Sequence, residues 1–165
     1  MAIFATVAGF DLVVVTVHLE SLNDPELRAK QAQEVVDLLE RNFPRMPAII
    51  AGDLNSSALP EGASQPDKVP DWFLHPHQYE PMFEVFDSAG FSWRSCNTAQ
   101  HTRRPLANGW PRPPFKKLDW GLSRDLAVRA FEVIPAVDDC GDPISDHELI
   151  SFEVSPRRST SKTQS

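Results

Sequence analysis

Residues 48–55 read Ala-Ile-Ile-Ala-Gly-Asp-Leu-Asn, a short apolar run that passes directly into polar residues. Four apolar residues in succession predict a short strand that is covered on both faces. Asp53 and Asn55 follow at its C-terminal end, where α/β proteins usually place their sites. The two side chains could equally form a turn by bonding their own backbone. This stretch therefore predicts a central strand and marks one position to test for function.

The residues before this strand predict a helix and a second strand. Asp24 can cap a helix over residues 24–43, and Pro25 suits its first turn. Residues 11–17 are rich in β-branched side chains and predict a strand that forms a hairpin with residues 3–7. Strand, helix and strand in this order predict a crossover unit. The expected apolar face of the helix consists of Leu27, Ala32, Val35, Val36, Leu39 and Phe43.

The rest of the chain predicts a sheet-based α/β sandwich in one domain, residues 1–155. Residues 56–80 hold many prolines and predict a loop, and Gly90 can close a short helix over 80–89. Further strands are expected over 117–122, 127–134 and 147–154. Strands near both ends of the chain fit an α/β fold built on sheets. The polar tail 156–165 has nothing apolar to bury, which predicts disorder.

Composition excludes several classes of protein. A chain of 165 residues has room for one domain, and no apolar run reaches the roughly 20 residues that a membrane-spanning helix needs. Two cysteines form no disulfide framework, so a reducing, cytoplasmic setting is expected. A net charge of −7 argues against a protein that coats nucleic acid non-specifically.

Charge is unevenly distributed along the chain. Residues 94–129 hold eight Lys and Arg residues and two Asp residues, a net charge of +6. Such a segment in an acidic protein is a candidate anion-facing edge, although a solvated loop would have the same composition. The cations are Arg94, Arg103, Arg104, Arg112, Lys116, Lys117, Arg124 and Arg129.

Four short polar clusters stand at the predicted strand ends: 16–20 (TVHLE), 52–55 (GDLN), 117–120 (KLDW) and 145–147 (SDH). Each has a structural explanation, such as a strand-end histidine, a turn or a surface ion pair. Together they supply what phosphate-ester hydrolysis needs. Carboxylates can hold a hard cation, a base can orient water, and donors can bind phosphate oxygens. Asp119 could also fix the tautomer of His147, as a carboxylate does behind a catalytic imidazole.

The order of these clusters resembles the endonuclease/exonuclease/phosphatase family. Its members include pancreatic-type deoxyribonuclease, exonuclease III, apurinic endonucleases, neutral sphingomyelinases and inositol polyphosphate 5-phosphatases. The helix with Arg28 and Gln31 and the passage of 49–51 into Gly52 and Asp53 also fit, and the resemblance covers roughly residues 5–154. It implies part of a four-layer α/β sandwich with mostly antiparallel and mixed sheets. It also implies a Mg²⁺- or Mn²⁺-dependent phosphoesterase whose substrate is a phosphodiester, with DNA as one candidate.

The resemblance assigns roles to five catalytic positions. Asp53 would orient or deprotonate the attacking water, and Asn55 would hold the phosphate and help to position Asp53. His18 would bond a phosphate oxygen and assist the leaving group. Asp119 would orient His147, which would contact the scissile phosphate or act as the base. Family members differ over whether the histidine or the aspartate is the base, so both assignments stay open.

The metal site is where this sequence departs from the family pattern. Asp146 would contribute to it, but the family's principal metal ligand is a glutamate that precedes the His-Leu motif, after an asparagine. Only 17 residues precede His18, and they contain neither Asn nor Glu. We therefore expect the chain to match the C-terminal portion of a family member, with exposed sheet faces that favour self-association. The alternative function is a non-catalytic remnant that binds phosphate or a partner chain.

A second metal hypothesis concerns His75, His77, Cys96 and His101. These are zinc-capable residue types, but their spacing matches no compact zinc finger. A structural zinc site is therefore the minor alternative.

Overall fold

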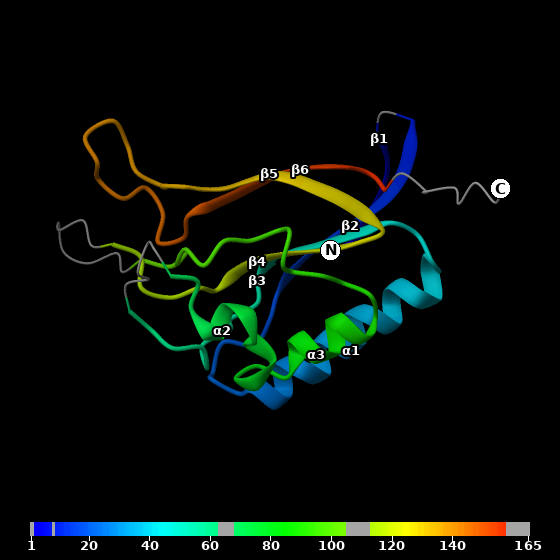
Figure 1. The fold of residues 1–165 in the computed structure, drawn as a ribbon, viewed down its shortest axis with the longest axis horizontal. Helices are drawn as coiled ribbons and strands as arrows, with labels where there is room; N and C mark the ends of the chain where they lie inside the picture. The colour runs from blue at the N-terminus through cyan, green and yellow to red at the C-terminus, as the bar shows by residue number, and fades with distance from the viewer. Residues whose placement is uncertain (1, 8, 63–67, 105–112, 158–165) are drawn as a thin grey trace.

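A four-stranded mixed sheet forms the centre of the molecule (Figure 1). The structure is a computed structural model and describes residues 2–7, 9–62, 68–104 and 113–157. The strand order is β1-β2-β3-β4, with β2 and β3 parallel and the other two pairs antiparallel. These strands are β1 (Ala2–Val7), β2 (Phe10–His18), β3 (Ala48–Asp53) and β4 (Asp119–Arg124).

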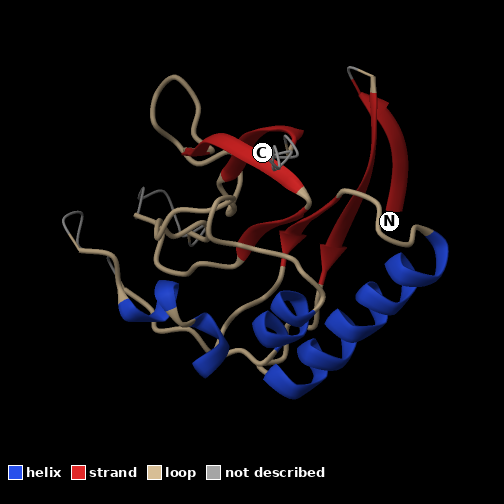
Figure 2. Cartoon of the chain, turned by 45° about the vertical axis from the view of Figure 1, so that its right-hand side comes forward, coloured by secondary structure: helices blue, strands red, loops and turns tan. Residues whose placement is uncertain are grey.

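The predicted hairpin and crossover unit are confirmed. Helix α1 (Pro25–Asn42) connects the parallel strands β2 and β3. It begins where the sequence predicts, because the Asp24 carboxylate accepts a hydrogen bond of 2.9 Å from the Leu27 N–H. Helix α3 (Met82–Ser88) packs beside it, within the predicted helix 80–89. Figures 1 and 2 show both helices on one side of the sheet.

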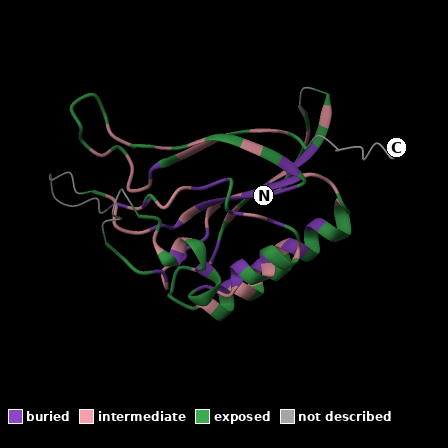
Figure 3. Ribbon diagram, in the orientation of Figure 1, coloured by how far each residue is buried: buried purple, intermediate pink, exposed green. Residues whose placement is uncertain are grey.

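A small second sheet lies on the opposite side of the central sheet (Figure 2). It consists of β5 (Leu126–Ile134) and β6 (Leu149–Pro156), which are antiparallel. Alternate residues of β2 face the two sides: Val13 and Val15 join the core under the helices, and Leu12 packs with Leu126. The continuous apolar run in β2 is therefore a strand covered on both faces, as predicted. Figure 3 shows the buried positions along the sheet and the inner faces of the helices.

The loop expected over residues 56–80 is wrong for part of its length. Helix α2 (Asp71–Leu74) and a 3₁₀ turn (Pro76–Gln78) occupy its end. Pro70 and Pro76 stand at the starts of these turns, where proline is tolerated, and buried Trp72 anchors them to the core. The prolines that suggested a loop instead mark the starts of short turns.

The strand boundaries also differ from the prediction by one or two residues. β4 begins at Asp119 rather than at residue 117, although the Leu118 carbonyl still accepts a hydrogen bond from the Leu54 N–H of the loop after β3. β6 runs from Leu149 to Pro156, so the tail begins one residue later than expected. Its predicted disorder concerns 158–165, which lie outside the described residues. No helix in the described part of the chain is long and apolar enough to cross a membrane.

Candidate functional site

Three of the predicted residues are neighbours across the central sheet. β2 and β3 pair His18 with Asp53, and β3 and β4 pair Asp53 with Asp119. The row arises because the carboxyl ends of two parallel strands meet the start of an antiparallel strand at the same edge. The fourth, His147, comes from the loop before β6 and is bridged to Arg103 of an extended segment. Residues distant in sequence thus meet at one end of the sheet.

Asp53 lies at the centre of this group. Its Oδ2 is 3.7 Å from His18 Nε2 and 3.8 Å from His147 Nε2. Its Oδ1 accepts a hydrogen bond of 2.8 Å from the Asn55 N–H. The Asp53 side chain is 16% exposed and that of His18 is 73% exposed. The site is therefore open on the His18 side, with one carboxylate oxygen held by the backbone and the other directed at two imidazoles.

His147 is held by a carboxylate behind it. His147 Nδ1 lies 2.8 Å from Asp119 Oδ2, which leaves Nε2 on the side of Asp53. Asp119 is itself fixed by its backbone, since its N–H donates to the Thr102 hydroxyl over 3.0 Å. A carboxylate on Nδ1 sets the tautomer and orientation of an imidazole. The arrangement can present either an imidazolium N–H or a lone pair to a substrate.

The electrostatics of the site separate the two candidate bases. Burial raises the pKa of Asp53 above its ordinary value, and the Asp119 charge adds to this. The Asn55 N–H and the two imidazoles act in the opposite direction. The hydrogen bond to Asp119 raises the pKa of His147, supported by the nearby carboxylates. A raised pKa favours the protonated imidazole of His147, which is a poorer base and a better donor, and it makes the carboxylate of Asp53 a stronger base.

The backbone on both sides of Asp53 adopts conformations that explain the choice of Gly52 and Asn55. At Gly52 a Cβ would collide with the Val17 carbonyl oxygen of the neighbouring strand, so only glycine fits. Asn55 has φ of +50°, a conformation that asparagine tolerates better than most residues. Its buried side chain donates from Nδ2 to the Leu19 carbonyl over 2.9 Å. Asn55 thus ties the loop after β3 to the loop after β2, and its use of a phosphate oxygen stays a prediction.

Asp146 faces Arg103 rather than the other carboxylates. Its Oδ2 is 2.9 Å from Arg103 Nη1. In the described residues, no group of three or more His, Cys, Asp or Glu side chains is arranged to hold a metal ion. Mg²⁺ prefers several oxygen ligands in strict geometry, and Asp53 alone offers too few. The described side chains therefore do not by themselves fit the Mg²⁺ or Mn²⁺ that the resemblance implies.

The zinc hypothesis also lacks a suitable arrangement. The rings of His75 and His77 are 5.9 Å apart, whereas His101 stacks on Trp72. Cys96 is buried, and its thiol contacts the Ser92 carbonyl and the Ser95 hydroxyl. These residues are not gathered into a tetrahedral set.

The basic segment 94–129 is not a free cationic edge in the described residues. Six of its cations form ion pairs with acidic side chains, and Lys117 is 2% exposed. The acidic partners lie outside the segment, so its sequence alone overstated the local charge. The pairs are Arg94–Asp87, Arg103–Asp146, Arg104–Glu148, Lys116–Glu61, Arg124–Glu40 and Arg129–Glu153. Arg112 lies outside the described residues.

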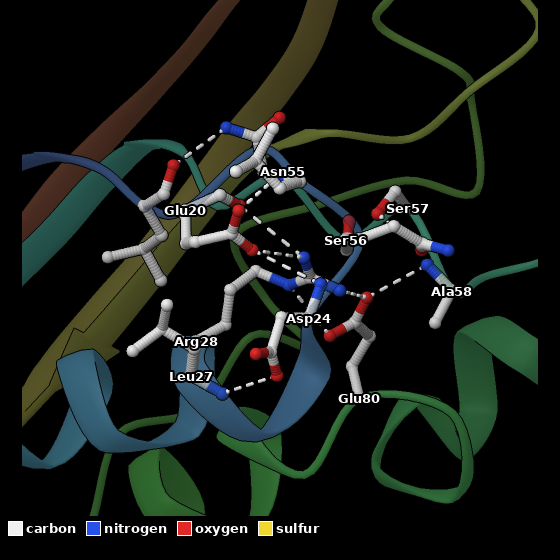
Figure 4. Close-up of polar contacts among 12 residues, drawn as sticks. Glu20, Asp24, Leu27, Arg28, Asn55, Ser56, Ser57, Ala58 and Glu80 are labelled. Carbon is white, nitrogen blue, oxygen red and sulfur yellow. Dashed lines mark hydrogen bonds and ion pairs between the residues drawn. The ribbon is translucent and has the colours of Figure 1, made fainter.

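Sequence reasoning missed a buried ion-pair network behind the site (Figure 4). Arg28 and Glu80 are both fully buried and form two hydrogen bonds, of 2.7 and 3.1 Å. Arg28 was not expected in the core, and Leu27 was, yet Leu27 is 40% exposed. The signal was present, because Arg28 precedes Ala32 and Val36 at four-residue spacing on the buried stripe of α1.

Comparison with known proteins places this geometry in a recognisable fold. No protein-family model and no curated protein sequence matches the chain. Among solved structures, an endonuclease/exonuclease/phosphatase from Bacteroides vulgatus matches with a TM-score of 0.64, at 16% identity over 91% of this chain and 51% of that one. A protein of the same family from Leptotrichia buccalis gives 0.60, at 18% identity over 93% and 53%. D. rerio TDP2 with a single-strand DNA product gives 0.57, at 20% identity over 92% and 58%.

The class that these matches define is therefore the endonuclease/exonuclease/phosphatase fold, as the resemblance implied. Proteins of this fold include nucleases and phosphatases, and a Bacteroides thetaiotaomicron mannosyl-6-phosphatase is among the matches, with a TM-score of 0.55 and 16% identity over 90% of this chain and 52% of that one. The chain spans about half the length of these structures. At this identity the likeness establishes the fold, and the activity is argued from the site.

Proposed function

We propose that this chain carries the proton-transfer and phosphate-binding part of a phosphoester hydrolase that acts by direct attack of water on phosphorus. The observation that supports this is the Asp53 carboxylate between two imidazoles, one of which is held by Asp119. An ionised carboxylate suits a water proton, and imidazole N–H groups suit the oxygens of a phosphate.

The proposed step needs no covalent enzyme intermediate. Water forms a bond to phosphorus and gives a proton to Asp53 Oδ2, while the bond from phosphorus to the leaving oxygen breaks. His147, whose pKa is raised by Asp119, donates from Nε2 to a phosphate oxygen. His18 is the more exposed imidazole and donates to a phosphate oxygen or to the leaving group. Of the two bases left open by the sequence, we therefore favour Asp53.

The substrate class proposed is a phosphodiester, and DNA is one candidate because the matching D. rerio TDP2 holds a DNA product. The ion pairs of segment 94–129 weaken the electrostatic argument for a long polyanion. A divalent ion stays a prediction from the resemblance.

The deciding experiment measures hydrolysis of bis(4-nitrophenyl) phosphate and of plasmid DNA by the purified chain, with Mg²⁺, with Mn²⁺ and with EDTA. Circular dichroism shows that the sample is folded, and Asp53→Ala is the control for contaminating enzymes. Turnover by the wild-type chain that is lost in the variant supports the proposal. A folded wild-type chain without turnover contradicts it.

The incomplete metal-ligand set specifically favours one second candidate, a non-catalytic domain that binds phosphate or a partner chain. It predicts that inorganic phosphate shifts the NMR signals of the His18 and His147 rings without turnover of any ester. Self-association through exposed apolar side chains also stays a prediction, and light scattering at increasing protein concentration measures it.

A further inference from the structure

The network behind the site joins the two loops that carry its residues. The loop after β2 begins with Leu19 and Glu20, directly after His18, and the loop after β3 begins with Leu54 and Asn55, directly after Asp53. Leu19 connects the two, because its N–H donates to the Asp53 carbonyl and its carbonyl accepts from Asn55 Nδ2. The position of Leu19 therefore influences both sides of the site.

Glu20 is fixed from four directions (Figure 4). Its N–H donates to Gln31 Oε1 over 2.8 Å, and its carboxylate accepts from the N–H groups of Leu22 and Asp24. Arg28 Nη1 lies 3.4 Å from both the Glu20 carbonyl oxygen and Oε2. The loop that follows His18 is thus attached to helix α1 through Arg28.

The same guanidinium reaches the second loop through Glu80. Arg28 Nη2 donates to Glu80 Oε1 over 2.7 Å, and this oxygen also accepts the Ala58 N–H over 2.9 Å. Arg28 and Glu80 are fully buried, so a planar, two-pronged contact replaces water on both groups. One arginine therefore connects the loop after His18 with the loop after Asn55.

We propose that Arg28 is a positioning residue that sets the separation of His18 and Asn55, the two residues expected to bind the phosphate from either side. This inference rests on the proposed function for its effect on rate, but its effect on geometry can be measured without turnover. A buried ion pair is a weak means of stabilisation, because desolvation offsets most of the attraction. The bidentate geometry instead suits the fixing of two loops relative to each other.

The test replaces both charges together. In Arg28→Met/Glu80→Leu the buried pair becomes apolar at similar volume, a change that often leaves stability unaltered. If the pair is merely structural, the double variant should keep the wild-type melting temperature and the wild-type function. If the pair positions the loops, the double variant should keep the melting temperature but lose function. We expect kcat on bis(4-nitrophenyl) phosphate to fall by about 10- to 100-fold, the size of effect that misplacement near 1 Å produces.

Arg124→Met is the matched control, since Arg124 is another largely buried arginine that pairs with a glutamate, Glu40. It lies at the end of β4 that is remote from Asp119. This variant should leave kcat within about twofold of wild type, as expected of a change remote from the site. A folded double variant with wild-type kcat overturns the inference. If the double variant does not fold, Arg28→Lys keeps the charge without the two-pronged contact, and retention of wild-type kcat in that variant overturns it equally.

The measurement that does not depend on turnover is NMR of the histidine rings with inorganic phosphate as the probe. The double variant should weaken the phosphate-induced shift of His18 at least about tenfold in apparent affinity, which is 1.4 kcal/mol. The His147 ring, held by Asp119, should titrate as in wild type. If wild type neither turns over nor binds phosphate, the proposed function fails. The positioning role is then judged by hydrogen exchange at the Leu19 amide, which bonds the Asp53 carbonyl and neither member of the pair, and unchanged protection there in the double variant overturns it.

Discussion

The two ends of the central sheet differ in chemistry although the same three strands build both. At one end the register row is His18, Asp53 and Asp119, and five residues away along each strand it is Val13, Ala48 and Arg124. The second row is buried, and its one charged side chain, Arg124, is paired with Glu40. Arg124 binds Glu40 and the Met46 carbonyl and lies over the Phe91 ring. The first row holds three titratable side chains, with Asp53 between the other two.

This difference shows where the fold accepts unfavourable electrostatics. Burial and the neighbouring Asp119 raise the pKa of Asp53, so the folded state disfavours its charged form. Groups held against their ordinary ionisation are typical of functional sites. The opposite end has no such arrangement among the row residues. The comparison predicts that substitutions at one end change rate and those at the other end change stability.

The largest effect is expected from Asp53→Asn. The rate of phosphodiester hydrolysis should fall by about 10³-fold, because the variant lacks the base while its oxygen still accepts the Asn55 N–H. Because the pKa of Asp53 is higher in the fold than in the unfolded chain, its ionisation destabilises the fold once pH exceeds the unfolded-state pKa. Below that pH both states are protonated and the destabilisation is absent. The variant should therefore have a higher melting temperature than wild type at pH 7. Thermal unfolding at pH 7 checks this, and a lower melting temperature would contradict the comparison.

The next effect is expected from Asp119→Asn, with a rate loss of about 10- to 100-fold from a misoriented His147. Asp119 raises the pKa of His147, so activity that needs imidazolium is present below that pKa and lost as pH rises through it. Without the carboxylate, the alkaline limb of the pH–rate profile should move to lower pH. A profile whose alkaline limb does not move would show that His147 does not act as a cation.

Much of the fold could be predicted because it rests on local patterns. The Asp24 cap, the apolar stripe of α1 and the continuous run in β2 each have one physical interpretation at the level of sequence. The row of His18, Asp53 and Asp119 also follows from strand ends. What the sequence leaves open is which partner each charge finds. Asp146 pairs with Arg103, a contact across more than forty residues that no local pattern specifies.

The buried charges show the same limit. Arg28 can lie on the inner face of α1 because the carboxylate of Glu80, 52 residues later, accepts hydrogen bonds from its guanidinium. A helical pattern identifies the position but not the distant carboxylate that makes an arginine acceptable there. The prediction of a cationic edge over residues 94–129 failed for a related reason, since the acidic partners of its cations lie in other parts of the chain. Short-range patterns predicted the elements, whereas long-range pairing decided the electrostatics.

Lys117 sharpens the comparison, because it adds a buried amine near the site end. Among the residues that the structure describes, its Nζ has no hydrogen-bond partner, and it lies 4.9 Å from the Trp120 ring centre. Burial lowers its pKa to about 7. Between about pH 10.5 and about pH 7 the unfolded chain holds this proton more readily than the fold does. The destabilisation of the fold by Lys117 therefore grows as pH falls through this range. Lys117→Met should raise the free energy of unfolding at pH 7 by about 1–2 kcal/mol.

Denaturant unfolding at pH 7 and near pH 10 measures this difference, which should shrink at the higher pH. Lys116→Met is the matched control, because Lys116 is 28% exposed and pairs with exposed Glu61. It should change the free energy of unfolding by less than about 0.5 kcal/mol. An equal gain in both lysine variants would attribute the effect to the methionine rather than to burial of a charge.

The smallest effect on rate is expected at the structural end of the sheet. Arg124→Met removes the contacts to Glu40 and Met46 but retains an unbranched apolar stem over Phe91. Because Glu40 is 47% exposed and can be hydrated, the loss should be modest, about 1 kcal/mol. The rate per folded molecule should stay within about twofold of wild type. A larger loss of rate without unfolding would mean that the strands transmit changes along their length, and that the two ends of the sheet are not independent.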